Sequence, residues 1–304
     1  MGVQKEWAIP VSIKQTDKNT ARKPTIMTIK IKDTQLKKLE SYALENYITE
    51  LVAHCDECYP HLRKTMGEEK LRHALKSGVD KAEQSGFTQR GPVQFYIDML
   101  IAFGAGFETD PQYPWIRESL ESTKQRPQIE RSSALYYLTK DYSEKKLGPQ
   151  SQYFFKAAEK LQALELEKLH VYKTGFVSYM HKILQEYYPQ KYATSGEEAI
   201  TALIQEGEQK AETRYGFTQA RPTAVLVGMM FLLGHEFDND PFYDWARLEK
   251  TSSYVDYTLI VDDQTFTANK LASRGKAWLV AAVENEKAFL LRQDNQNNQE
   301  KGIS

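Results

Sequence analysis

Residues 81–115 read KAEQSGFTQRGPVQFYIDMLIAFGAGFETDPQYPW, and residues 210–245 repeat the phrase as KAETRYGFTQARPTAVLVGMMFLLGHEFDNDPFYDW. The two copies lie roughly 130 residues apart, and self-similarity at a fixed distance indicates a duplicated structural module. Each copy serves as a control for the other. Residues that occur in both copies are candidates for what the module needs, and an active-site residue found in one copy alone is harder to credit as an ancestral function.

Each copy predicts the same succession of helices and turns. Gly86 ends one helix, because glycine adopts the left-handed conformation that stops a helix. Pro92 begins the next, since a first-turn proline loses no hydrogen bond. That second helix is apolar nearly all round, which predicts burial. Asp110 and Pro111 then read as the cap and first residue of a short helix that carries Trp115.

Outside the copies, the pattern predicts a mainly α fold of two related helical modules packed together, with two short β-hairpins. Apolar residues alternate in 7–13 and 25–32, near the N-terminus, and again in 254–266, before the C-terminal helix. A long helix is expected over 156–188. The predicted divisions are an N-terminal β segment (1–32), helical module 1 (33–131), a connecting segment (132–155), helical module 2 (156–251), a β-hairpin with the C-terminal helix (252–292) and a disordered tail (293–304).

Composition narrows the classes of function. The 304 residues carry a net charge of -1, so no overall basic excess points to nucleic acid. No apolar run is long enough to span a bilayer, and none resembles a secretory signal near the N-terminus. Two cysteines are too few for a disulfide framework. These features favour a cytoplasmic protein with no membrane or nucleic-acid partner.

Two clusters resemble metal sites. Cys55 and Cys58 form a Cys-x-x-Cys flanked by histidines, but the second copy has Leu184 and Tyr187 there, which favours a core role over a metal. A redox dithiol is the alternative. The second cluster, residues 235–240, is rich in carboxylates. Only its Phe and its final Asp recur in the first copy, and helix capping explains that Asp.

No standard catalytic or phosphate-binding motif occurs, so we predict no catalytic, cofactor-binding or metal-ligating residue. The paired acids at 68–69 and 197–198 fit the first turn of a helix, where negative charge is favourable. The repeated aromatic pairs either pack the module's own helices or anchor a partner. The candidate partner-binding residues are Tyr113, Trp115, His235, Glu236, Asp238, Tyr243 and Trp245.

The repeated phrase, together with the Tyr-Pro that precedes it at 59–60 and 188–189, resembles helical proteins of Gram-negative bacteria encoded beside type VI secretion spike and effector genes. The resemblance covers 33–122 and 168–251. The second copy and the strand-bearing ends depart from it. It transfers no catalytic residue, because the shared positions are glycine, proline, aromatic and capping residues. It implies a bacterial cytoplasmic protein that handles or neutralises a secreted toxin.

The leading hypothesis is therefore a non-enzymatic protein-binding protein, either an immunity protein against a toxin or an effector chaperone or adaptor. The alternative is an enzyme or toxin with an unrecognised helical active site that depends on a metal. His235, Glu236 and Asp238 would carry that site, because they diverge between the copies. A nucleic-acid-binding helical repeat is disfavoured by the lack of clustered Lys and Arg. The oligomeric state is open.

Overall fold

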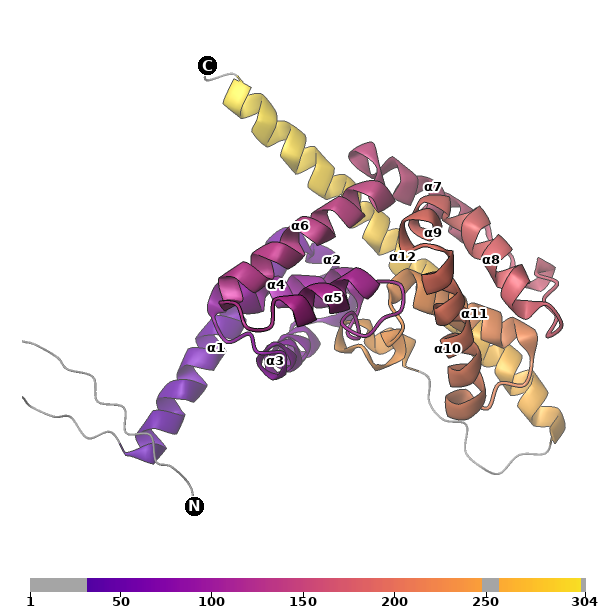
Figure 1. Ribbon diagram of the computed structural model, residues 1–304, viewed down its shortest axis with the longest axis horizontal. Coiled ribbons are helices and arrows are strands. Elements are labelled where there is room, and N and C mark those ends of the chain that lie inside the picture. Colours follow the sequence, from indigo (N-terminus) through magenta and orange to yellow (C-terminus); the bar gives the residue numbers. More distant parts are fainter. Residues whose placement is uncertain (1–31, 248–256, 302–304) are drawn as a thin grey trace, which may run out of the picture. The chain divides into compact units, whose positions relative to one another are not determined.

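The computed structural model describes residues 32–247 and 257–301, and these residues are almost entirely helical (Figure 1). They contain no β-strand. The α-helices are α1 (Asp33–Cys58), α2 (Pro60–Met66), α3 (Glu68–Gln84), α4 (Arg90–Phe103), α5 (Pro114–Ser122), α6 (Gln128–Leu147), α7 (Gln152–Ala163), α8 (Phe176–Tyr187), α9 (Pro189–Ser195), α10 (Glu197–Tyr215), α11 (Ala220–Leu233) and α12 (Tyr257–Lys301). Short 3-10 helices are η1 (Pro149–Ser151), η2 (Leu166–Lys168), η3 (Phe237–Asn239) and η4 (Pro241–Ala246).

The chain divides into two compact units, one ending at Tyr47 and the other beginning at Ile48. In the first unit the described residues form the beginning of α1. Leu36, Leu39 and Tyr42 lie exposed on it. The second unit contains both copies of the repeated phrase.

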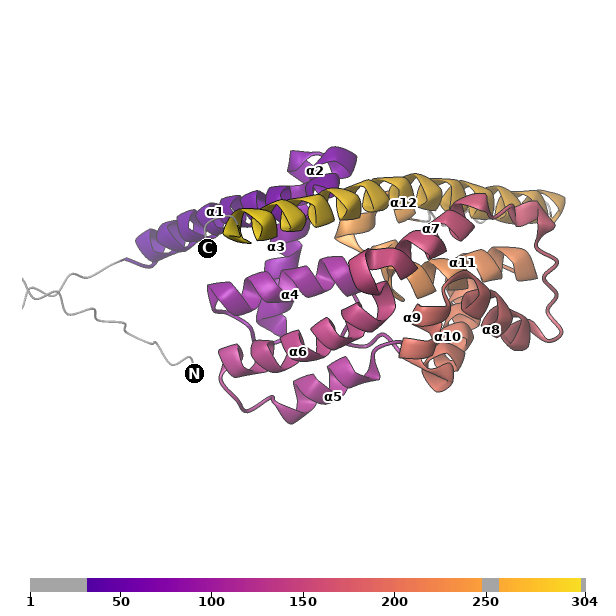
Figure 2. The same ribbon diagram turned by 90° about the horizontal axis from the view of Figure 1, so that it is seen from above.

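The repeat is a pair of packed helices followed by a turn. In the first copy α3 packs on α4, and in the second α10 packs on α11 (Figure 2). Gly78 in α3 and Gly207 in α10 lie where a side chain would meet the apolar residues of the partner helix. The missing side chain lets the two helices approach closely, and this explains why both copies have glycine there.

The two copies contact each other through their backbones at Gly104 and Gly234. A Cβ placed on Gly104 would lie 2.4 Å from the carbonyl oxygen of Leu233, and one on Gly234 would lie 2.5 Å from that of Phe103. Both glycines have positive φ, at 92° and 99°. Backbone therefore crosses backbone at this point, and the reciprocal contacts are those a local two-fold axis produces.

Each copy also completes the hydrogen bonding of the other. Asp110 accepts from the backbone N–H of His235 at 2.8 Å, and Asp240 accepts from that of Ala105 at 2.7 Å. With its second oxygen, Asp240 caps η4 through the N–H of Phe242, as the sequence predicts. In the first copy the corresponding helix, α5, begins at Pro114 instead of Pro111.

The repeated lysines serve the same crossing. Lys81 Nζ donates to the carbonyl oxygen of Ala105 at 3.2 Å, and Lys210 Nζ donates to that of His235 at 2.6 Å. Each lysine thus fixes, within its own copy, the residue whose N–H group donates to the aspartate of the other copy. These hydrogen bonds satisfy backbone groups that the crossing buries.

The repeat extends further than the sequence comparison indicates, because α6 and α12 are equivalent. Gln128 Oε1 accepts from the N–H groups of Thr88 and Gln89, ahead of α4. Gln264 Oε1 does the same for residues 218 and 219, ahead of α11. In the same register Tyr142 packs on the aromatic pair of the first copy, and Trp278 packs on that of the second.

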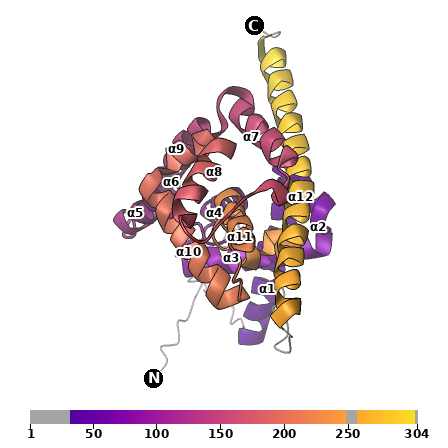
Figure 3. The ribbon, with the colours of Figure 1, turned by 90° about the vertical axis from the view of Figure 1, so that its right-hand side faces the viewer.

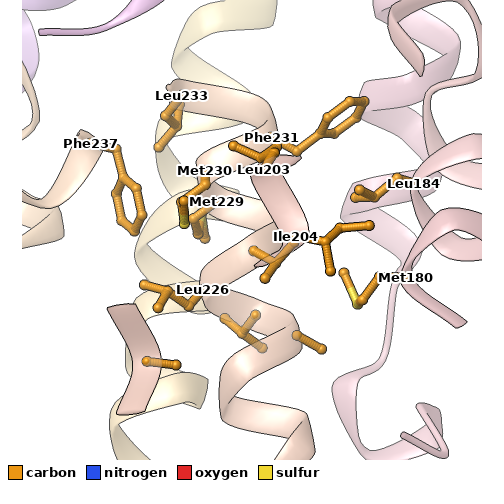
Figure 4. Packing of buried hydrophobic residues seen from close by; sticks show 14 of the residues in the cluster. Met180, Leu184, Leu203, Ile204, Leu226, Met229, Met230, Phe231, Leu233 and Phe237 are labelled. Carbon is orange, nitrogen blue, oxygen red and sulfur yellow. The ribbon is translucent and has the colours of Figure 1, made fainter. Parts of the chain in front are cut away.

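The second copy is built around a continuous apolar core. Met180 and Leu184 of α8 point toward Leu203 and Ile204 of α10, and the apolar side chains of α11 fill the space beside them (Figure 4). Burial of these side chains stabilises the fold at about 25 cal/mol per Å² of apolar surface. α12 lies along α11 and α7 (Figures 2 and 3).

The predicted β-hairpin over 254–266 is wrong, since residues 257–266 belong to α12. Alternation over so few residues also fits a helix, and the buried positions that follow show helical spacing: Gln264, Ala268, Leu271, Gly275 and Leu279. The N-terminal hairpin, at 7–13 and 25–32, lies outside the described residues except for Lys32.

Three further expectations need correction. The helix predicted over 156–188 is broken between Ala163 and Phe176, where Gly175 takes a positive φ of 75° before α8 begins. The predicted connecting segment 132–155 is mostly α6, which belongs to the first module. α12 continues to Lys301, into the segment predicted to be a disordered tail.

Among the described residues, no helix has both the length and the apolar character that crossing a bilayer requires.

Candidate functional site

The structure places the repeated aromatic pairs in the two cores. Tyr113 and Tyr243 are buried, and the rings of Trp115 and Trp245 are half-buried against their partners from α6 and α12. Aromatic contacts of this kind stabilise a core beyond the area they bury. These four residues therefore present little surface to a partner.

His235, Glu236 and Asp238 lie together, within a network of ion pairs. Asp238 is buried and pairs with Lys210 at 2.8 Å and Arg214 at 3.3 Å. Glu236 also pairs with Lys210, at 3.2 Å. Two protein cations thus neutralise the two carboxylates, as buried charges require.

Both ring nitrogens of His235 have partners. Nδ1 lies 2.7 Å from Glu206 Oε1, and Nε2 lies 3.0 Å from the carbonyl oxygen of Gly106. Two acceptors favour the imidazolium, in which both nitrogens donate. Burial opposes the charge, but the hydrogen bond to Glu206 and the nearby carboxylates outweigh it, so the pKa of His235 lies above 6.5.

Glu206, His235 and Glu236 also form a group whose ligand atoms lie within 4.8 Å of one another, close enough to hold a metal ion. A metal would have to displace the proton that joins His235 to Glu206 and compete with Lys210 for Glu236. A metal ligand must be deprotonated, whereas this environment favours protonated His235. The hydrogen bonds and ion pairs therefore explain why these three residues lie together without a metal ion.

Replacing Glu206 with glutamine is expected to lower the pKa of His235, because the charged hydrogen-bond acceptor that favours the imidazolium is lost. Raised above its unfolded value, the pKa of His235 stabilises the fold fully below pH 6.5, and this contribution is lost as pH rises through the folded-state pKa. In Glu206→Gln the folded-state pKa is lower, so the contribution is smaller and its loss is complete at a lower pH. NMR titration of the His235 ring measures the shift. Glu212→Gln, an exposed change on the same helix, is the control. An unchanged pKa would show that Glu206 does not hold the proton.

The two cysteines are poor candidates for redox or metal chemistry. Cys55 is buried, and burial raises the pKa of its thiol to about 12. Burial and the charge of Asp98 also raise the pKa of Cys58. The thiolate is the reactive and metal-binding form, and this environment disfavours it. The structure therefore favours the core role predicted from the second copy.

A different surface has the properties of an interaction site. Ile129, Tyr136 and Tyr137 lie exposed along one face of α6, at i, i+7 and i+8. The Tyr136 ring contacts Tyr137 at 5.6 Å and the half-buried Phe95 of α4 at 6.2 Å. We call these four residues the α6 aromatic face. Exposed apolar groups that gather on one face are typical of binding surfaces, and tyrosine is enriched where binding energy concentrates.

The α6 aromatic face belongs to one copy only. In the register set by Gln128 and Gln264, the α12 positions equivalent to its three α6 residues are Thr265, Ala272 and Ser273. Phe95 corresponds to the buried Val225 of α11. The core of the module does not need these aromatics, since the second copy folds without them.

The sequence prediction did not include this face. The signal that would have found it is the spacing Gln-x6-Leu-x6-aromatic, which occurs at Gln128, Leu135 and Tyr142 and again at Gln264, Leu271 and Trp278. Aligning the two helices on that spacing separates the shared core residues from the aromatics specific to α6.

Comparisons with protein-family models, with curated proteins and with solved structures find no match to this chain.

Proposed function

We propose that this chain is a non-enzymatic protein-binding protein of the bacterial cytoplasm. Its partner is a secreted toxin or effector of a type VI secretion locus, and it acts as an immunity protein that neutralises the toxin or as an adaptor that carries the effector. The resemblance of the repeated phrase to proteins of such loci supports the class of partner. A non-enzymatic role is supported by the repeated residues, because their side chains pack in the cores or form the hydrogen bonds of the crossing.

The observation that carries the proposal is the α6 aromatic face. Its exposed side chains have no role in the core that the second copy needs, and exposed apolar side chains are costly to keep unless a partner covers them. Tyrosine suits a protein partner because it combines a large apolar ring with a hydroxyl and loses little conformational entropy.

An affinity pull-down with the full chain from its native bacterium, analysed by mass spectrometry, tests the proposal. The expected result is one stoichiometric product of a neighbouring gene. Co-expression with that product then separates the two roles: an immunity protein restores growth, whereas an adaptor binds without protecting. If no toxin of its own locus forms a complex with the chain, and none is neutralised by it, the proposal is overturned.

Replacing both Tyr136 and Tyr137 with alanine is expected to weaken binding to the recovered partner by about 1,000-fold, since buried tyrosines at an interface each contribute on the order of 2 kcal/mol and about 1.4 kcal/mol is a factor of ten. Isothermal titration calorimetry measures the change. Tyr172→Ala is the matched control, because Tyr172 and Tyr137 are both 70% exposed but Tyr172 lies outside the face. Equal affinities for all three proteins would place the interface elsewhere.

A further inference from the structure

An apolar cavity of about 330 Å³ lies among α7, α8, α11 and α12, whose arrangement can be followed in Figure 3. Its volume falls within the range of small-molecule sites. Most of its walls are apolar, with leucines of α7 and the segment after it facing residues of α11. Gly228 of α11 leaves part of the wall open, because no atom lies within 4 Å of the place where its Cβ would stand.

Two lysines line the same cavity. Lys191 of α9 is buried at 3% exposure, and Lys146 of α6 is half-buried. Lys191 Nζ donates to the hydroxyl of Tyr113 at 3.2 Å, which uses one of its three N–H donors. Each ammonium group also lies over an aromatic ring: Lys191 Nζ is 5.0 Å from the centroid of Phe231, and Lys146 Nζ is 5.6 Å from that of Tyr142.

Neither ammonium has a carboxylate partner within the part of the chain that the structure describes. The acids that influence them, Asp110 and Glu286, lie beyond ion-pair distance. Asp110 accepts from backbone N–H groups, and Glu286 accepts from the hydroxyl of Ser151. Burial lowers the pKa of Lys146 to about 8, and burial together with the charge of Lys146 lowers that of Lys191 well below its usual range.

We propose that this cavity binds a single-chain amphiphile with an anionic head group, a long-chain fatty acid carboxylate. The alkyl chain fills the apolar space along α7, α8 and α11, and the carboxylate accepts from Lys146 and Lys191. Charge complementarity selects this ligand, because ammonium groups that line an apolar cavity without a counter-ion gain most from a carboxylate. Lys191 sets the head-group position through its bond to Tyr113.

Titration of the full chain with hexadecanoate and with hexadecanol, using displacement of a fluorescent fatty acid, tests the ligand class. Hexadecanoate is expected to bind at least about tenfold more tightly, since the alcohol lacks the charge-assisted hydrogen bonds. Across octanoate, dodecanoate and hexadecanoate, each added methylene is expected to strengthen binding about fourfold until the cavity is full. Equal affinity for acid and alcohol, or binding independent of chain length, would overturn the proposal.

Two variants locate the site. Lys191→Met keeps the length of the side chain and is expected to remove the preference for the acid over the alcohol, whereas Lys145→Met, an exposed lysine one residue before Lys146, keeps it. Gly228→Leu fills the open wall and is expected to abolish binding of both ligands while the melting temperature holds or rises. Undiminished binding by a folded Gly228→Leu variant would place the ligand outside the cavity. Tyr136→Ala and Tyr137→Ala, on the α6 aromatic face, are expected to leave fatty acid binding unchanged.

Discussion

Replacing Gly104 with alanine is expected to lower the free energy of unfolding by more than about 3 kcal/mol. Two costs add at this position. At φ 92° and ψ 162° only glycine is comfortable, and a Cβ would lie 2.4 Å from the carbonyl oxygen of Leu233. That neighbour is backbone and part of the crossing between the copies, so it cannot move aside as a flexible side chain would. Urea denaturation followed by circular dichroism measures the loss.

Gly67 provides a matched control. Its conformation, φ 80° and ψ 163°, is nearly that of Gly104, but nothing lies within 4 Å of its Cβ position. Gly67→Ala therefore reports the conformational cost alone, of about 1 to 3 kcal/mol. The excess in Gly104→Ala measures the steric overlap at the crossing. If the two variants lose equal stability, the backbones at the crossing separate easily and the contact is not tight.

Replacing Asp240 with alanine is expected to cost about 3 kcal/mol, because it leaves the N–H groups of Ala105 and Phe242 without an acceptor. Asp240→Asn retains one oxygen and should lose about half as much. Asp244→Ala, which removes a surface ion pair with Lys70, is the control and should cost less than about 1 kcal/mol. Chemical denaturation at fixed pH compares the three variants. Equal losses in Asp240→Ala and Asp244→Ala would show that the cross-copy bond contributes nothing.

Asp240 also makes the stability of the fold depend on pH. Burial raises the pKa of Asp240 to about 6, from 3.8, despite hydrogen bonds that favour the carboxylate. Between these values the folded state binds more protons than the unfolded state, so the contribution of Asp240 to stability falls as pH rises from 3.8 to about 6. In Asp240→Asn that part of the slope is expected to disappear.

The duplication and most of the helices can be predicted from the sequence, because local signals carry them. Gly86 and Pro92 mark the ends of neighbouring helices, and Asp240 caps the turn before Pro241 without help from distant residues. The alternation in 254–266 misleads because so short a segment fits either period. The segment is helical because it continues into α12, whose following residues, such as Leu271, pack in the core.

The candidate sites depend on contacts that local signals do not carry. The correspondence of α6 with α12 is hidden because Gln128 and Gln264 stand six residues further apart than Gly86 and Gly216 do. The sequence explains Asp110 as a cap, yet its partner across the crossing is 125 residues away. Lys146 and Lys191 line the same cavity only because α6 packs against α9, so no spacing in the sequence predicts the cavity.

The reciprocal bonds between Asp110 and Asp240 follow the rule of an isologous homodimer, in which residue i of one subunit meets residue j of the other and the reverse. A true homodimer displays every surface twice and binds two partner molecules. Joining the halves in one polypeptide makes their association independent of concentration and lets each half change alone. The α6 aromatic face occurs once among the described residues, so this chain is expected to bind the proposed partner with one-to-one stoichiometry.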